Sequence, residues 1–249
     1  MGKVSSNLVR IWLDHYDLSG YLNSAEQSLN IPLADVRCFG DEGPKRAVLD
    51  LPDHDHSVGG LYDHESGVAS HDAEFWQGIY TNAASNHYLA KSFGGNVRGA
   101  VCYDAVVNLS EMPWGLAMGA AQTLGRAAQG SDNIGRGVIL EPKGAITGNG
   151  NRTGVNQGAT VAGQVYAVTF RVFSENVVTF DWKIQQSQND GGADPYADVA
   201  GLTGTVTVVG VTRVTTILAT EAWKRLVIAN WNGVTATVSC TGVALPVLA

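Results

Sequence analysis

Histidine is the residue type whose placement in this sequence most suggests chemistry. All six histidines precede position 90: His15, His54, His56, His64, His71 and His87. In the run His54-Asp55-His56, two imidazoles two residues apart on a strand would share one face, and a third metal ligand could come from His64 or His71. Val58 and Gly59 stand where a His-x-His-x-Asp-His metallohydrolase has its Asp and its third His. We therefore expect solvent-facing or interface histidines and no metal site.

Acidic residues suggest a second kind of chemistry, cation binding. In the run NDGGADPYAD, Asp190, Asp194 and Asp198 recur every four residues, but the run lacks the spacing and the closing Glu of an EF-hand. The pairs Asp14/Asp17 and Asp53/Asp55 are typical of turns and solvent-facing positions.

Motifs of nucleophilic and phosphate chemistry are absent. The sequence has no Gly-x-Ser-x-Gly, no P-loop and no His-Glu-x-x-His. We therefore predict a protein that is not an enzyme, with no catalytic, cofactor-binding or metal-binding residues and no cofactor.

Composition narrows the possible partners. Of the 249 residues 45% are hydrophobic and only 16% are charged, below the ~25% of a typical soluble domain. The net charge of −7 does not suit nucleic-acid binding, which requires clustered Lys and Arg. The low charge is explained either by self-association or by a β protein rich in Thr, Ser and Gly. No apolar run is long enough for a membrane span, and Cys38, Cys102 and Cys240 fit neither a disulfide framework nor a zinc site.

The elements that would position such residues are mainly strands. Alternating segments predict strands at 7–13, 24–31, 47–62 and 93–109, and Ser70 is a suitable N-cap for one helix near 70–85. Glycine-rich or broken segments predict exposed loops at 35–46 and 144–163.

The C-terminal part has a different pattern. From residue 164 onward, short β-branched segments separated by turn residues are typical of a β-sandwich or barrel. Asn232-Gly233 predicts a type I′ hairpin. We place a domain boundary near residue 150, so that residues 1–148 form a β domain with one flanking helix and residues 149–249 a second, all-β domain.

The order of several short motifs resembles the tail tube (major tail) proteins of long-tailed bacteriophages. The N-terminal matches are Asp17-Leu18-Ser19-Gly20, Asp35-Val36, Phe39-Gly40-Asp41, Leu51-Pro52-Asp53 and Gly60-Leu61-Tyr62-Asp63. A later match is IQQSQNDGGADPYADV, followed by WKRLVIANW. There the sequence departs from the family pattern, with Gln186 for His, Gln188 for Ala and Tyr196 for Trp.

This resemblance implies a β-sandwich or barrel protomer with a tail-tube-like fold. Such protomers would form stacked hexameric rings whose lumen passes DNA without specific binding. The expected partners are copies of the chain and other phage tail proteins, with no membrane. The expected location is the virion tail, after assembly in the host bacterial cytoplasm. Under this hypothesis the loops 35–46 and 144–163 bridge neighbouring rings, and strands such as 164–173 complete a sheet across subunits.

Three alternatives remain open, the last of which is an enzyme and rests only on the histidine cluster. The first is a capsid decoration protein or another tail virion protein. The second is a carbohydrate-binding β module, in which an exposed Trp223 or Trp231 would provide a stacking platform; in a protein without that function these side chains would lie in a core.

Overall fold

A computed structural model describes residues 9–20, 22–30, 33–35, 46–48, 53–61, 86–111, 114–115, 123–130, 134–176 and 179–246. These residues are mainly β, which confirms the predicted fold class, and they include no helix. No described helix is therefore long and apolar enough to cross a membrane. The helix expected at 70–85 and most of the loop expected at 35–46 lie outside the described residues.

The chain divides into two compact units that alternate along the sequence. Unit 1 contains residues 1–20, 88–105 and 134–247, and unit 2 contains residues 21–87, 106–133 and 248–249. Strand β8 (Val101–Glu111) continues from unit 1 into unit 2. Residues on both sides of position 148 belong to unit 1, and the division into domains at that position remains a prediction.

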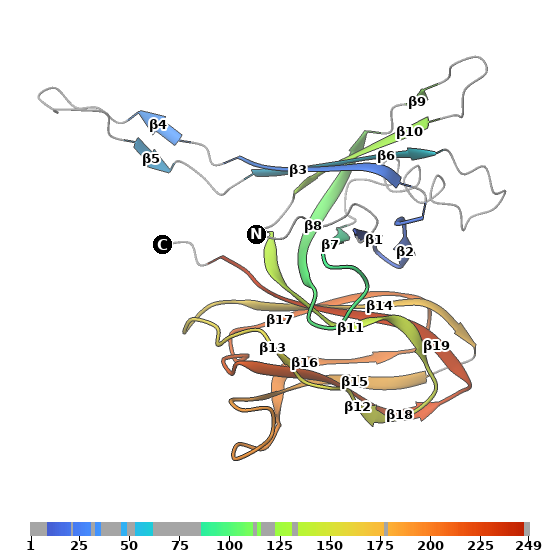
Figure 1. The fold of residues 1–249 in the computed structure, drawn as a ribbon, viewed down its shortest axis with the longest axis vertical. Helices are drawn as coiled ribbons and strands as arrows, with labels where there is room; N and C mark the ends of the chain where they lie inside the picture. The colour runs from blue at the N-terminus through green and yellow to red at the C-terminus, as the bar shows by residue number, and fades with distance from the viewer. Residues whose placement is uncertain are drawn as a thin grey trace, which may run out of the picture. The chain divides into compact units, whose positions relative to one another are not determined.

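Unit 1 is a sandwich of two antiparallel layers (Figure 1). The first layer, called the β14 sheet, has the order β17 (Gly210–Thr216), β14 (Tyr166–Asn176), β19 (Thr235–Ala244), β11 (Gly135–Ile146) and β8. The second, called the β18 sheet, has the order β12 (Gly150–Asn151), β18 (Trp223–Asn232), β15 (Thr179–Ser187) and β16 (Ala197–Val206), with β13 (Val155–Asn156) also on β18. The short strands β1 (Arg10–Leu13), β2 (Tyr16–Asp17) and β7 (His87–Ser92) pair alongside β8.

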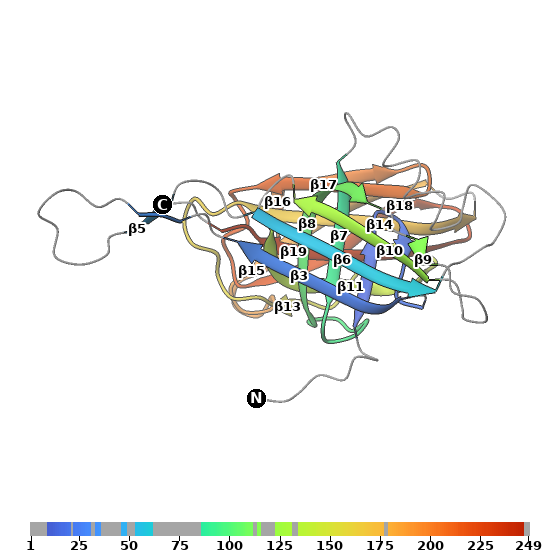
Figure 2. The same ribbon diagram turned by 90° about the horizontal axis from the view of Figure 1, so that it is seen from above.

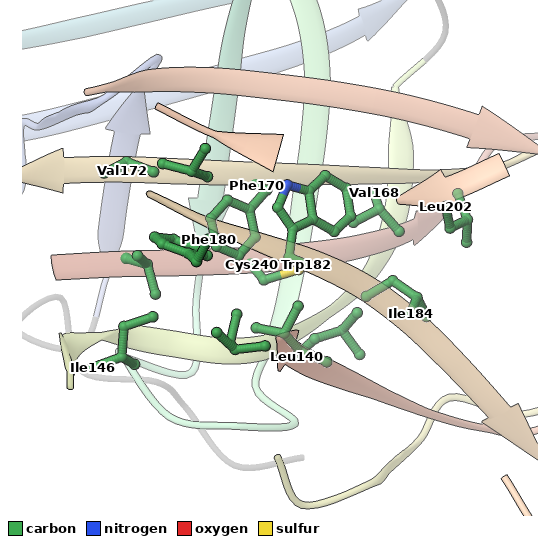
Figure 3. Close-up of a cluster of buried hydrophobic side chains, with 14 of the residues drawn as sticks. Leu140, Ile146, Val168, Phe170, Val172, Phe180, Trp182, Ile184, Leu202 and Cys240 are labelled. Carbon is green, nitrogen blue, oxygen red and sulfur yellow. The ribbon is translucent and has the colours of Figure 1, made fainter. Parts of the chain in front are cut away.

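Aromatic side chains from both layers meet in the core of the sandwich (Figure 3). Phe170 of β14 stacks on Trp182 of β15 with ring centroids 5.0 Å apart, and Phe180 stacks on Trp231 at 5.1 Å. Alternation places every second residue of each strand in this core, where burial of one large apolar side chain contributes about 1.5–3 kcal/mol. Trp231 is partly buried and packs against this core, as expected of a protein without a sugar-stacking function.

Two strand pairings expected from the sequence are wrong. Strand β14 is paired along both edges, with β17 on one side and β19 on the other, so the segment 164–173 offers no edge to a second subunit. Asn232-Gly233 does not close a hairpin, because β18 pairs with β15 whereas β19 pairs with β11 and β14. The turn instead carries the chain from one layer of the sandwich to the other.

The glycine-rich segment 144–163, predicted as a loop, is largely loop in the structure but includes two short strands. It begins within β11, and its short strands β12 and β13 pair with β18. Arg152 N donates to Leu226 O at 2.8 Å and Gln157 N donates to Ala222 O at 2.9 Å. These bonds fix the segment on an edge of the β18 sheet, and its expected role as a bridge between rings remains a prediction.

Unit 2 contains an antiparallel sheet with the order β8, β10 (Thr123–Gly130), β6 (Asp53–Leu61) and β3 (Leu22–Asn30) (Figure 2). Strand β9 (Trp114–Gly115) pairs with one end of β10, and β4 (Leu33–Asp35) pairs with β5 (Arg46–Val48) as a separate ribbon. Strands β3 and β6 confirm the strands expected at 24–31 and within 47–62.

Candidate assembly surface

Strand β3 is an edge strand of the sheet in the described part of unit 2. Eight residue pairs join β3 to β6, and within the described residues no strand pairs with the opposite edge of β3. A row of N–H and C=O groups along such an edge is a template for another strand. The β3 edge is therefore a surface at which a further chain could extend the sheet.

The side chains of β3 are compatible with burial in an interface. Ser24, Ala25, Glu26 and Ser28 are exposed, and they are small or carry a single charge among them. Natural edge strands that must remain monomeric commonly carry Lys, Pro or several charges. Of these protective features, the four side chains retain only Glu26.

The predicted histidine pair lies on β6, one strand inward from this edge. His54 Nδ1 and His56 Nε2 are 2.8 Å apart, so the expectation that both rings share a face is confirmed. The two side chains are buried rather than solvent-facing, with 2% and 4% of their surface exposed. Gly130 of β10 explains this burial in part, because a Cβ at this position would overlap the His54 ring.

His64 and His71 lie outside the described residues, and the His15 ring contacts the Tyr16 ring at 4.1 Å. The described residues contain no group of three His, Cys, Asp or Glu side chains that could hold a metal ion.

The carboxylates of the NDGGADPYAD run do not converge. Asp190 accepts a hydrogen bond from Tyr196 Oη at 2.7 Å, and Asp194 accepts one from Gln188 N at 2.7 Å. Asp198 binds Lys183 Nζ and Gln185 Nε2, each at 2.7 Å. The recurrence every four residues therefore reflects a β-hairpin loop with separate local contacts.

The Asp17-Leu18-Ser19-Gly20 motif forms a specific turn in unit 1. Ser19 Oγ donates to Asp17 Oδ1 at 2.6 Å and accepts from Ile11 N at 2.9 Å, while Leu18 is buried. Asp17 Oδ2 also pairs with Lys143 Nζ at 2.8 Å. Burial alone would raise the pKa of Asp17, but the hydrogen bonds from Lys143 and Ser19 outweigh it and lower that pKa.

Asp14 confirms its predicted turn position. It adopts a left-handed φ of 48°, and its carboxylate accepts Tyr88 N at 2.7 Å. Only 6% of its surface is exposed, so the expectation of a solvent-facing residue is wrong.

A buried ionic cluster in unit 1 has no counterpart in the sequence analysis. Asp104 Oδ2 lies 3.1 Å from Arg171 Nη2, and Asp104 Oδ1 pairs with Arg213 Nη1. Thr241 Oγ1 donates to Asp104 Oδ2 at 2.7 Å, and Thr169 Oγ1 donates to Asp104 Oδ1 at 3.1 Å. The only sequence signal is a charged residue at an alternate position of an apolar strand, as in Phe170-Arg171-Val172.

Two guanidinium groups flank the single carboxylate of this cluster. Burial would raise the pKa of Asp104, but Arg171 and Arg213 together with the Thr241 hydroxyl outweigh burial and hold that pKa below its ordinary value. Both oxygens of the Asp104 carboxylate are bound, and among the described residues no substrate-sized opening lies beside them. The cluster therefore acts as a structural tie between β8, β14, β17 and β19.

No protein-family model matches the sequence. No curated protein matches it. Among solved structures, a chain from the virion of a native gene transfer agent particle is 14% identical, with a TM-score of 0.42, over 53% of this chain and 97% of that chain. A chain from the tail of an empty gene transfer agent particle is 12% identical, with a TM-score of 0.39, over 53% of this chain and 97% of that chain.

A third similar structure is the SPP1 Dit protein, described as a hub adsorption apparatus of phages that infect Gram-positive bacteria. It is 10% identical, with a TM-score of 0.36, over 94% of this chain and 98% of that chain. At these identities and TM-scores the likenesses do not establish a shared fold.

Proposed function

We propose that this protein is a non-enzymatic structural component of a bacteriophage tail that assembles with copies of itself into stacked rings, the tail tube. The open edge of β3 is the observation that carries this proposal. Pairing of this edge with another subunit would satisfy its backbone groups and bury its uncharged side chains.

Strand directions in unit 2 are compatible with a ring. Each neighbouring pair in the order β8, β10, β6 and β3 is antiparallel, so β8 and β3 run in opposite directions. If subunits are related by rotation, β3 of one subunit would meet β8 of the next in antiparallel orientation. The contact would lie beyond Asp104, because Val101 to Asp104 of β8 already pair with β11. The sheet would then continue around the ring with unbroken alternation, and a closed sheet has no edges.

Sequence features support the same function. The ordered motifs shared with tail tube proteins include the Asp17–Gly20 turn, whose contacts fix the start of the chain in unit 1. The net charge of −7 would let DNA pass an inner surface without being retained.

Negative-stain electron microscopy of the concentrated full chain, together with sedimentation velocity, tests the proposal. We expect rings or hollow tubes and a mass that grows with concentration. A chain that sediments as a monomer at all concentrations and shows no rings would overturn the proposal.

A matched pair of variants locates the interface. Consecutive N–H groups of a strand point to opposite edges, so proline at Glu26 and at Gln27 removes one bond to β6 in one variant and one edge donor in the other. We expect Glu26→Pro and Gln27→Pro to differ. The variant that loses the bond to β6 should unfold more easily. The variant that loses the outer-edge donor should keep its melting temperature but form no rings.

A charge variant keeps the interface test independent of backbone changes. Ser24→Lys combined with Ser28→Lys adds two positive charges to the exposed edge strand and leaves its backbone hydrogen bonds in place, although it removes the 3.4 Å bond from Ser24 Oγ to Gly59 O. We expect this variant to fold and to remain monomeric. Normal rings from a folded edge variant would exclude β3 as the interface.

A further inference from the structure

The outer face of the β18 sheet, opposite the sandwich core, carries a group of polar side chains drawn from three strands. Gln185 of β15 lies opposite Asp198 of β16 on one side and opposite Arg225 of β18 on the other. Trp182 and Ile184 point into the core, so the alternating residues Lys183 and Gln185 face outward.

Hydrogen bonds join these side chains into one network. Asp198 accepts Lys183 Nζ and Gln185 Nε2 at 2.7 Å each, and Gln185 Oε1 accepts Arg225 Nε at 2.9 Å and Nη2 at 2.7 Å. The hydrogen bonds from Lys183 and Gln185 lower the pKa of Asp198, so it remains an ionised acceptor at neutral pH. A carboxylate accepts about four hydrogen bonds, and these contacts occupy two.

Aromatic rings flank the network. The Arg225 guanidinium lies 3.9 Å from the centroid of the Tyr196 ring. Trp223, two residues before Arg225 on β18, projects to the same face and is half-buried. The face therefore combines flat apolar surface with side chains that donate and accept.

The loop that carries Tyr196 is fixed before any ligand binds. Ser187 Oγ donates to Asp194 O at 2.7 Å and accepts Gly191 N at 2.8 Å. Gly154 and Gly191 lie so close to Tyr196 that a Cβ at either position would overlap its side chain. Preorganised side chains lose little conformational entropy on binding, which favours affinity.

The charges of this face select the class of ligand. The network of Lys183, Asp198 and Arg225, with Asp190 bonded to Tyr196, contains two cationic and two anionic groups. A balanced surface does not attract phosphate chains or polycations over distance. It suits a neutral ligand with many hydroxyl groups that donate and accept, and with apolar C–H faces that pack on aromatic rings.

We propose that the outer face of the β18 sheet, around Gln185, Asp198, Arg225 and Trp223, binds neutral hexopyranose units of a glycan. The carboxylate of Asp198 and the amide of Gln185 bind adjacent hydroxyl groups, and the Trp223 ring packs against the C–H face of the sugar. This inference is independent of ring assembly, since it rests on unit 1 alone.

Saturation-transfer difference NMR with the full-length protein tests this site. The probes are D-glucose, D-galactose, D-mannose and N-acetyl-D-glucosamine, each measured separately. We expect transfer to the ring C–H protons of at least one sugar, and a decrease of fivefold or more in Asp198→Ala and in Trp223→Ala. Absence of transfer to all four sugars would overturn the proposal.

Asp181→Ala provides the matched control. Asp181 projects from the same face of β15 and accepts bonds from Thr205 Oγ1 and Asn230 Nδ2, each at 2.6 Å, but it is four residues away from Gln185. We expect this variant to bind sugar as the wild type does, with circular dichroism confirming the fold of all variants. Equal binding by Asp198→Ala and wild type, or equal losses in Asp198→Ala and Asp181→Ala, would exclude the proposed site.

Discussion

Arg171 Nη2 and Asp104 Oδ2 lie 3.1 Å apart, and neither side chain has any exposed surface. The two residues belong to β14 and β8, strands that are not neighbours in the β14 sheet. Removal of one member of a buried ion pair leaves an uncompensated charge in a region of low dielectric constant, which costs more than the pair itself contributes.

Asp104→Leu should therefore strongly destabilise the protein, because it leaves the buried guanidinium groups of Arg171 and Arg213 without their shared carboxylate. We expect a loss of about 3–5 kcal/mol in the free energy of unfolding, measured by urea denaturation. Lys183→Met, which breaks the exposed Lys183–Asp198 pair, serves as the control and should cost less than about 1 kcal/mol. Equal losses in the two variants would show that the buried cluster is not a structural tie.

Acid should weaken the same tie. Because the pKa of Asp104 is lowered from 3.8, the folded state binds fewer protons than the unfolded state, and stability is lost as the pH falls from 3.8 through the folded pKa. We expect Asp104→Asn to be less stable than wild type at pH 7 and to lose less stability between pH 4 and about pH 2. Melting temperatures measured across this range check the difference in slope, and parallel curves would contradict it.

Lys224 should produce a dependence of the same sense, but at alkaline pH. Its ammonium is buried and lies 4.8 Å from the Tyr166 ring centroid, and burial lowers its pKa from 10.5 to about 8. Between these values the unfolded state binds more protons, so stability should rise with pH. We expect this rise in urea midpoints of the wild type and its absence in Lys224→Met. A wild type without the rise would show that Lys224 keeps its proton when folded.

Gly204 should not tolerate a side chain. A Cβ at this position would lie 2.7 Å from Trp182 Nε1, within the core of the sandwich. We expect Gly204→Val to cost about 1–3 kcal/mol, measured by thermal unfolding followed by tryptophan fluorescence. Gly150→Ala is the control, because nothing lies within 4 Å of its added Cβ. An unchanged melting temperature in Gly204→Val would contradict the close contact.

The local sequence was sufficient to predict many strands but not their partners. Alternation in segments such as 24–31 depends only on which face of a strand is buried, so β3 and β6 were predictable. The connection at Asn232-Gly233 was predicted as a hairpin because its residues suit a tight turn, yet β18 and β19 belong to different layers. Whether two consecutive strands pair with each other or join different layers depends on hydrogen bonds with strands far away in the sequence.

The candidate sites show the same division. The spacing of His54 and His56 was sufficient to place both rings on one face, since side chains alternate along any strand. Their burial depends on β10, where Gly130 leaves room for a ring. The partners of Asp198 and Arg225 come from other strands, so the outer-face network could not be recognised from the NDGGADPYAD run alone.

The sequence by itself determined a β-rich chain with low charge, its main strands and the Asp17–Gly20 turn, because these features depend on residue types and short spacings. Only the tertiary structure decided which edges remain open, which loops pair with the sheets and which charges are buried together. Asp104, Arg171 and Arg213 are separated by up to 109 positions, and sheet pairing brings them into contact. The tie they form is a property of strand order, which local sequence does not encode.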